Sequence, residues 1–236
     1  MIFRVTANVS RAAHRAARFI LAGCFILIAS GGCMAAAGAG INSQFLDAAA
    51  RGDATRVGAL LSEGADIEAR DRSGRTALLL STHGNHVDVA RLLIAAGADV
   101  NAKDSISDTP YLYAGAEGRN EILMMTLEAG ADLASTNRYG GTALIPAAHH
   151  GHPETVKILL GTAININHIN RLGWTALIEA VILSDGGPVH TEIVRLLVDA
   201  GADVNIADRD GVTPLAHARR RGYARMVAIL EKAGAK

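Results

Sequence analysis

The sequence predicts an all-α repeat solenoid, in which short helix pairs stack side by side. The main observation is a period: the stretch from Asp71 to Lys103 returns 33 residues later, and again after the same interval. Most copies also carry two short apolar blocks separated by a glycine or an asparagine. A fixed period of roughly 20 to 50 residues is typical of stacked-repeat folds. We therefore expect four complete units and two truncated end units, over residues 42–70, 71–103, 104–136, 137–169, 170–207 and 208–236.

The first 40 residues differ in composition from these repeats. They contain four arginines and no acidic residue, then an apolar run from Phe19 to Ser30, then a stretch of small residues. This order of basic, apolar and small-residue segments is that of a secretory signal. We expect export to a periplasm-like or extracellular space, with cleavage just before Gly38 or Gly40.

The same segment supports other interpretations. One is a retained membrane anchor, because no charged residue occurs between Phe19 and Leu46 and about 20 apolar residues span a bilayer. In that case the repeats would still lie on the far side of the membrane. A lipoprotein cleavage box at Cys24 is disfavoured because too few apolar residues precede it, and at Cys33 because Ser30 stands where leucine is usual. The solid apolar block disfavours a mitochondrial transit peptide.

Charge and cysteine content limit the partners and the chemistry of the repeats. The whole chain is formally neutral, and without the four arginines of the leader it holds 19 bases and 23 acids. A slightly acidic domain argues against nucleic acid as a partner. Both cysteines, Cys24 and Cys33, precede the repeats, which therefore have no thiol for a disulfide, a thiolate metal site or a nucleophile.

A column of hydroxyl residues predicts where the first helix of each repeat begins. A side-chain oxygen at this position accepts a hydrogen bond from a free N–H in the first turn. In two copies the next residue is proline, Pro110 and Pro214, which is tolerated at the first helical position. We expect the capping residues to be Ser43, Thr76, Thr109, Thr142, Thr175 and Thr213.

Two further columns predict where the helices end. Both are occupied almost entirely by glycine, with one asparagine, and these residues tolerate a positive φ angle. The first column follows the hydroxyl by nine residues and predicts a turn between the two helices at Gly52, Asn85, Gly118, Gly151 and Gly222. The second follows an apolar block, such as Val89–Ile94, and predicts that the second helix ends at Gly64, Gly97, Gly130, Gly201 and Gly234.

With Thr-(Pro/Ala)-Leu at the helix starts and Gly-Ala-Asp-Val-Asn at the repeat ends, residues 42–236 resemble the ankyrin repeat family. The resemblance implies a β-turn, two helices and a loop in each repeat, stacked into a curved solenoid whose concave surface binds proteins. Two copies depart from the pattern. The third has Ser107 in place of glycine and Thr126 in place of a core leucine, and the fourth lacks Gly-Ala-Asp at residues 163–165. We expect these two repeats to be the softest joints of the stack.

In that family the variable positions are the hairpin tips and the exposed edge of the first helix, so the resemblance places a protein-binding surface there. Arginine recurs in one tip column, and the single tryptophan, Trp174, lies in another beside Leu172. Trp, Tyr and Arg are enriched in interface hot spots. The competing interpretation is that the arginines are simply solvated and that Trp174 packs on a neighbouring hairpin. The candidate partner-binding residues are Arg72, Arg75, Tyr113, Arg138, Tyr139, His149, Arg171, Leu172, Trp174 and Arg209.

Three close histidines, His149, His150 and His152, raise the alternative of a metal-dependent enzyme. Adjacent histidines diverge on a helix, and few acids stand nearby to complete a metal shell, so we expect no metal and no cofactor. Phosphate-loop, zinc-protease and nucleophile-elbow motifs are all absent from the sequence. The sequence therefore predicts a non-enzymatic module that binds an unidentified protein, and it leaves open the role of the inserted residues Ser184–Pro188.

Overall fold

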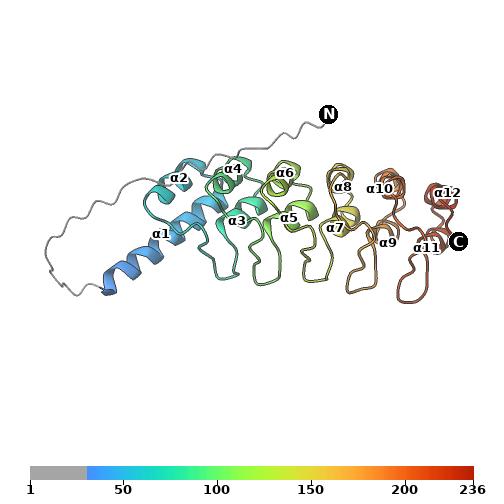
Figure 1. Ribbon diagram of the computed structural model, residues 1–236, viewed down its shortest axis with the longest axis horizontal. Helices are drawn as coiled ribbons and strands as arrows, with labels where there is room; N and C mark the ends of the chain where they lie inside the picture. Colours follow the sequence, from blue (N-terminus) through green and yellow to red (C-terminus); the bar gives the residue numbers. More distant parts are fainter. Residues whose placement is uncertain (1–30) are drawn as a thin grey trace, which may run out of the picture.

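The computed structural model describes residues 31–236, and their side chains from Gly40 onward. In this part of the chain twelve helices form two parallel rows, and there is no β-strand (Figure 1). The first helices of the six repeats are α1 (Gly31–Arg51), α3 (Ala77–His83), α5 (Pro110–Ala116), α7 (Leu144–His149), α9 (Ala176–Ile182) and α11 (Pro214–Arg220). The second helices are α2 (Ala54–Ser62), α4 (Val87–Ala95), α6 (Asn120–Glu128), α8 (Pro153–Leu160), α10 (Pro188–Asp199) and α12 (Ala224–Lys232).

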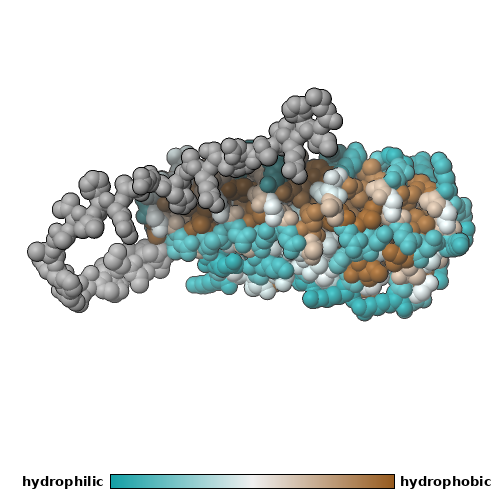
Figure 2. Space-filling model, viewed as in Figure 1, coloured by the Kyte–Doolittle hydropathy of each residue, from teal (hydrophilic) through white to brown (hydrophobic). Residues whose placement is uncertain are grey.

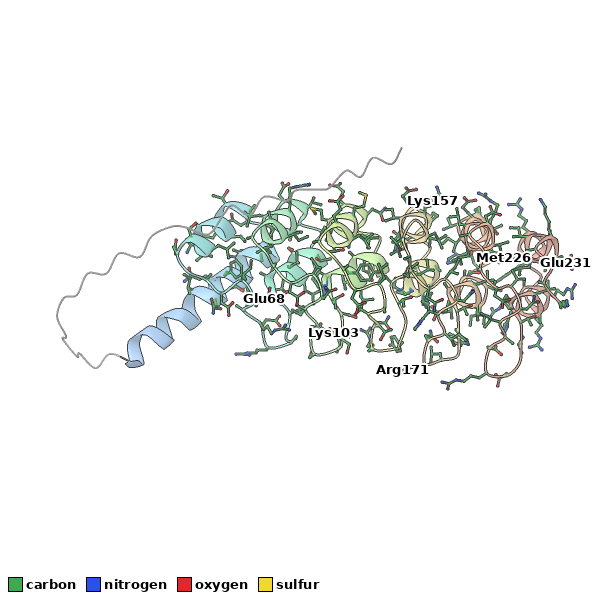
Figure 3. The ribbon with its side chains drawn as sticks, in the orientation of Figure 1. Glu68, Lys103, Lys157, Arg171, Met226 and Glu231 are labelled. Atoms are coloured by element: carbon green, nitrogen blue, oxygen red, sulfur yellow. The ribbon has the colours of Figure 1, made fainter. Side chains whose placement is uncertain are left out.

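The two rows give the solenoid two unlike sides. Hairpin loops that connect successive repeats project below the row of first helices (Figure 1). In Figure 2 this hairpin edge is largely hydrophilic, and hydrophobic atoms gather in the band of helices above it. Figure 3 shows Lys157 on the side of the second helices and Arg171 on the opposite, hairpin side. The predicted all-α repeat solenoid is therefore confirmed.

Four threonines cap the first helices as predicted. The hydroxyl of Thr76 accepts a hydrogen bond from the backbone N–H of Leu79, and the same bond recurs in three other repeats. Each removes one of the free donors that every helix start exposes. The other three capping residues are Thr109, Thr175 and Thr213.

The predicted caps at Ser43 and Thr142 are wrong. Ser43 lies inside α1, which continues back to Gly31 through an alanine-rich stretch of strong helix formers. At Thr142 the chain turns more tightly: Ile145 donates its N–H to the Thr142 carbonyl, so α7 begins without a side-chain cap. The Thr142 hydroxyl is buried without a partner.

The predicted turn positions have the left-handed backbone that glycine favours. All nine predicted glycines have positive φ, and Asn85 joins them at 55°. One hairpin is an exception in its residue type: Ser107 has a φ of 68° where the other hairpins use glycine. A left-handed conformation of a non-glycine residue costs roughly 1 kcal/mol, so the third repeat carries local strain.

The apolar columns of both helices form one continuous core. The second helices contribute fully buried side chains at matching positions, such as Leu60, Leu93, Leu159 and Leu197. Each such side chain contributes about 1.5–3 kcal/mol by leaving water. Because a repeat buries these faces only against its neighbours, the stability of the array depends on every interface.

A ladder of hydrogen bonds ties the end of each repeat to the next, with one missing step. A side chain of one repeat accepts a hydrogen bond from the backbone N–H two residues before the matching position in the next repeat. The pairs of acceptor and donor residues are Glu68–Asp99, Asn101–Asp132, Asn167–Asp203 and Asn205–Lys236. The corresponding residue of the third repeat is Ala134, which has no side-chain acceptor. The junction between repeats 3 and 4 therefore lacks the bond, in line with the expectation of a soft joint there.

The predicted leader lies mostly outside the described residues. Its basic segment and its apolar run fall within residues 1–30, while α1 crosses the expected cleavage positions Gly38 and Gly40. Among residues 31–236, no helix combines the length and the apolar character needed to cross a membrane.

Candidate functional site

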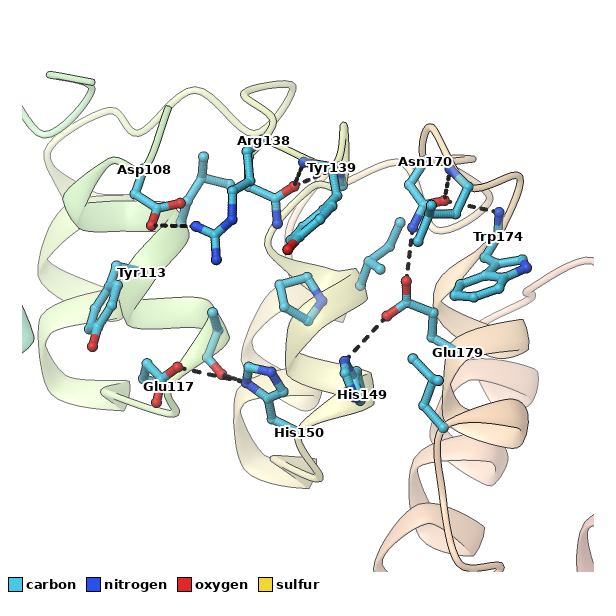
Figure 4. Close-up of a pocket in the computed structure, with 18 residues that line it drawn as sticks. Asp108, Tyr113, Glu117, Arg138, Tyr139, His149, His150, Asn170, Trp174 and Glu179 are labelled. Atoms are coloured by element: carbon cyan, nitrogen blue, oxygen red, sulfur yellow. Dashed lines mark hydrogen bonds and ion pairs between the residues drawn. The ribbon is translucent and has the colours of Figure 1, made fainter. Parts of the chain in front are cut away.

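The hairpins and first helices of repeats 3, 4 and 5 enclose a groove of about 410 Å³ (Figure 4). Its walls come from α5, α7 and α9 and from the hairpin that precedes each of these helices. Six of the ten candidate residues line it, namely Tyr113, Arg138, Tyr139, His149, Leu172 and Trp174. The groove is therefore built by residues that lie far apart in the sequence and meet through the 33-residue spacing.

Local hydrogen bonds fix the hairpin that carries Trp174. The side-chain oxygen of Asn170 accepts the backbone N–H of Leu172 at 2.9 Å and that of Trp174 at 3.0 Å. Asparagine and aspartate stabilise such turns because their short side chains replace a backbone acceptor. The turn holds the half-buried Trp174 at the wall of the groove, with Leu172 at the exposed tip.

Glu179 supplies a buried carboxyl group to the same end of the groove. Its side chain reaches from α9 and is only 5% exposed. Oε1 accepts a hydrogen bond from the Asn170 amide at 2.8 Å, and Oε2 lies 3.7 Å from Nδ1 of His149 (Figure 4). Burial raises the pKa of Glu179 to about 7, and the bond from Asn170 opposes that rise only in part.

The other end of the groove carries compensated charges. Arg138 lies 3.4 Å from the Asp108 carboxylate and stacks over the ring of Tyr139, 5.0 Å from its centroid. Burial raises the pKa of Asp108, while the charge of Arg138 opposes the shift. Nearby, Glu117 lies 3.8 Å from Nδ1 of His150. The two ends of the groove therefore differ, because only Asp108 has a permanently charged partner.

Exposed hydrophobic side chains occur on the three hairpins of repeats 3–5, and two of them, Tyr139 and Leu172, line the groove. Ile106, Tyr139 and Leu172 occupy one tip column in three successive hairpins and are 47%, 53% and 43% exposed. The same column holds Ser73 in the second repeat and Asp210 in the last. Large apolar side chains are thus exposed over repeats 3–5, where the groove lies, and polar ones flank them. Exposed apolar clusters of this kind mark interaction surfaces.

Four candidate arginines lie outside the groove. Arg75 pairs with Asp71 of its own hairpin, and Arg72 is exposed on the second hairpin. Arg171 donates to the Arg138 carbonyl at 3.1 Å, and Arg209 donates to the Arg171 carbonyl. The stem of Arg209 occupies the space beside Gly173, where an added Cβ would meet its Cγ at 2.5 Å. Arg171 and Arg209 therefore fasten adjacent hairpins together.

The histidines near α7 and α8 have structural contacts. The ring N–H of His150 donates to the Ala116 carbonyl at 2.7 Å, and that of His86 donates to the Ala50 carbonyl at 3.0 Å. His190 makes the same bond to the carbonyl of His149 at 2.9 Å. Each bond satisfies a carbonyl at the end of the preceding first helix. In the part of the chain that the structure describes, no three metal-ligating side chains converge.

The inserted residues of repeat 5 make contacts to the last repeat. Ser184 accepts a hydrogen bond from the hydroxyl of Tyr223 at 2.7 Å. The Tyr223 ring also packs beside Gly186, which has a φ of 72° and leaves no room for a Cβ. The insertion therefore serves the interface between repeats 5 and 6, and it lies outside the groove.

Several lining residues were not among the candidates. Glu179 belongs to the exposed edge of a first helix in the family pattern, yet its burial and its bond to Asn170 give it the most perturbed carboxyl of the groove. The available signal was an acid in a column that holds no other acid in repeats 2–6. The other lining residues outside the candidate set include Leu112, Ala116, Asn137, Ile145, Pro146 and Leu183.

The comparison with known families decides the classification of this fold. The family model described as "Ankyrin repeats (3 copies)" matches residues 45–137, 111–208 and 170–236. The chain belongs to the ankyrin repeat family. Ankyrin repeat domains are in general protein–protein interaction modules, so a protein is the class of partner that this membership supports.

Two solved ankyrin repeat structures resemble the chain over most of the repeats, and a further relative matches a shorter part of it. A crystal structure of an ankyrin repeat domain from Acinetobacter baumannii AYE is 56% identical, with a TM-score of 0.79, and covers 81% of this chain and 98% of its own. The ankyrin repeat protein EF0377 is 43% identical with a TM-score of 0.78 over the same shares. The putative ankyrin repeat protein YahD of Escherichia coli (strain K12) is 44% identical over 57 residues, which are 24% of this chain and 28% of that protein.

Proposed function

We propose that this protein is an exported, non-enzymatic scaffold that binds a protein partner through the groove of repeats 3–5 on its concave face. The observation that carries the proposal is the exposure of Tyr139 and Leu172, which line that groove, together with the exposure of Ile106 on the hairpin of repeat 3. Aromatic side chains beside a cleft are the usual anchors of protein interfaces, because they bury much area with little loss of conformational freedom. The groove also holds Trp174, which supplies a further anchor.

The shape and chemistry of the groove favour binding over catalysis. Glu179 bonds to Asn170, Asp108 pairs with Arg138 and His150 bonds to a backbone carbonyl, and these contacts place no activated nucleophile beside a base. The groove runs across three repeats, and this elongated shape suits a segment of a partner chain better than it suits a small molecule.

Substitution of the aromatic anchors tests this proposal. We expect Tyr139→Ala and Trp174→Ala each to weaken the affinity for a partner captured from the native cell extract by about tenfold or more. Their melting temperatures should stay close to that of the parent, because Tyr139 is 53% exposed and Trp174 is not part of the core. Lys157→Ala, on the opposite side of the stack, is the matched control (Figure 3). Equal capture by all three variants would place the interface elsewhere.

Export is tested separately at the N-terminus. Determination of the first residue of the mature protein distinguishes the two arrangements of the leader. Gly38 or Gly40 as the first residue supports a cleaved, exported protein. A chain that still begins at Met1 and fractionates with membranes supports an anchored scaffold, which the uncharged stretch from Phe19 to Leu46 favours as the second candidate.

A further inference from the structure

One column of the repeat shows what is unusual about Glu179. The residue four positions after the threonine near the start of each first helix forms one column, which reads Leu80, Tyr113, Pro146, Glu179 and His217 in repeats 2–6. In the last repeat His217 bonds to the Asp208 carboxylate at 2.7 Å, which joins a base to an acid. In repeat 5 Glu179 bonds to Asn170, which is neutral. The two repeats thus share the contact but not the charge balance.

The groups around Glu179 do not neutralise it. His149 on α7 lies 3.7 Å away, but burial, together with the charges of His150 and His190, lowers the pKa of His149. On α10, His190 donates to a backbone carbonyl, and on α11, His217 is occupied by Asp208. No lysine or arginine of the described residues is paired with this carboxylate among the ion pairs of the structure. A buried carboxylate without a cation is destabilising, which is a property that functional sites often carry.

The walls beside Glu179 suit a long aliphatic chain that ends in a positive charge. Trp174 and Glu179 are on the same side of the close-up in Figure 4, and Leu172, Leu183 and Ile145 line the same groove. Lysine and arginine bury their methylene stems against such surfaces and keep their charge on a polar group. An indole face also attracts a cation directly.

We infer that the groove binds a lysine or arginine side chain of the partner, with the Glu179 carboxylate as counter-charge and Trp174 beside the aliphatic stem. The inference rests on the proposed function, because it assigns the chemistry of one partner residue in the same groove. A cation here would complete in the complex the acid–base pairing that His217 and Asp208 complete within the last repeat.

This pairing makes binding dependent on pH. The pKa of Glu179 is about 7 in the free protein, so the carboxyl is largely ionised at pH 8 and largely protonated at pH 5.5. A cationic side chain binds the ionised form, and its affinity therefore increases as the pH rises through the neutral range. His149, which also lines the groove and whose pKa is lowered by burial, would gain positive charge only at acid pH and would then repel the cation in the same direction.

Short peptides and the single tryptophan of the chain provide the test. The probes are acetylated and amidated peptides of sequence Gly-Ala-Xaa-Ala-Gly, in which Xaa is lysine, arginine or norleucine. Because Trp174 is the only tryptophan in the sequence, its fluorescence reports on the groove directly. At pH 8 we expect the lysine or the arginine peptide to bind at least about tenfold more tightly than the norleucine peptide, as charged hydrogen bonds would give. The ratio between the two basic peptides identifies the preferred cation.

Glu179→Gln is the decisive variant, because glutamine keeps the acceptor for Asn170 and removes the charge. We expect it to reduce the affinity for the basic peptide about tenfold at pH 8 and to have little effect at pH 5.5. Glu154→Gln makes the same chemical change on α8, outside the groove, and should leave binding unchanged. Equal binding of the basic and norleucine peptides, or full binding by Glu179→Gln at pH 8, would overturn the inference.

The outcome is separable from that of the proposed function. If the natural partner is lost with Trp174→Ala but retained by Glu179→Gln at pH 8, the groove is the interface and the cation assignment is wrong. If neither substitution affects the partner, the groove itself is not the interface.

Discussion

In repeats 5 and 6 the side chains at the same two positions of the repeat contact each other, but the two pairs balance their charge differently. In repeat 6 the buried Asp208 accepts from the ring of His217, and in repeat 5 the buried Glu179 accepts from the amide of Asn170. Burial would raise the pKa of Asp208, but hydrogen bonds from Val212, His217 and Asp210 outweigh it and hold that pKa below its usual range. Burial prevails at Glu179, whose pKa rises to about 7.

The comparison shows that the same backbone conformation accommodates two different side chains, Glu179 and His217, with different roles at one position of the repeat. Repeat 6 closes the stack, where an acid–base pair within the repeat is stabilising. Repeat 5 forms a wall of the groove, where the acid is left for an external partner in the proposal above. Natural proteins commonly give up stability at such sites in exchange for function.

The largest expected effect follows from adding a second acid to repeat 5. Asn170→Asp would place a carboxylate within hydrogen-bond distance of Glu179, and two buried like charges repel strongly. We expect the free energy of unfolding at pH 8, measured by urea denaturation, to fall by about 2–4 kcal/mol.

A matched control exists one repeat earlier. Asn137 makes the same two turn hydrogen bonds as Asn170, but Pro146 stands in the column where Glu179 lies. Asn137→Asp should therefore change stability by less than about 0.5 kcal/mol. Combining Asn170→Asp with Glu179→His copies the pair of repeat 6, and we expect most of the loss to be restored. An equal loss for Asn137→Asp and Asn170→Asp would contradict the comparison.

Removing the charge of Glu179 should have the opposite sign. The pKa of its carboxyl is about 7 in the folded chain against an ordinary value of 4.5, so the folded chain holds more protons between those pH values. Stability therefore falls as the pH rises from about 4.5 to 7, and the loss is complete above pH 7. We expect Glu179→Gln to be more stable than the parent by about 1–3 kcal/mol at pH 8 and nearly equal to it at pH 4.5.

Thermal or urea unfolding of both proteins across this pH range measures the difference. A Glu179→Gln protein that is less stable than its parent at pH 8 would show that the ionised carboxylate is already compensated in the folded chain. This stability change is opposite in direction to the expected loss of peptide binding, so misfolding of the variant cannot mimic the result.

The smallest expected effect concerns the junction between repeats 3 and 4. Ala134→Asn would supply the acceptor that the inter-repeat ladder lacks there, and we expect a gain of about 0.5–1 kcal/mol. Asn101→Ala, which removes the existing bond to the N–H of Asp132, should produce a loss of similar size. Hydrogen exchange of the amide of Asn165 in the Ala134→Asn protein measures whether the new bond forms. Unchanged exchange would mean that the backbone geometry at the junction between repeats 3 and 4 differs too much from that of the other junctions for the bond to form.

Much of the fold could be predicted because each local sequence pattern occurs in several copies of the repeat. Thr76 and Thr175 cap helices as expected, and Asn85 adopts the left-handed turn that its column requires. The predictions failed where a single copy departs from the rule. Ser43 lies inside a longer helix instead of capping one. At Thr142 the backbone carbonyl, and not the hydroxyl, accepts the hydrogen bond in a tighter turn.

The candidate site was predictable in outline only. The family pattern identified the faces that would be exposed, and six of the ten candidates do line one groove. The pattern could not distinguish Arg138, which pairs with Asp108 in the groove wall, from Arg171, which donates to a hairpin carbonyl. Both are arginines at the same position of the repeat, and only the neighbouring hairpin decides the contact of each.

The sequence by itself determined the period, the helix pairs, the turns and the family, because these depend on residue types at fixed spacing within about 33 positions. Only the tertiary structure decided that repeats 3–5 enclose a groove and that Glu179 is buried there beside a neutral asparagine. Burial and charge balance arise from side chains of successive repeats that meet only after stacking. Solvation and pairing of a carboxylate depend on that three-dimensional environment, which spacing along the chain does not specify.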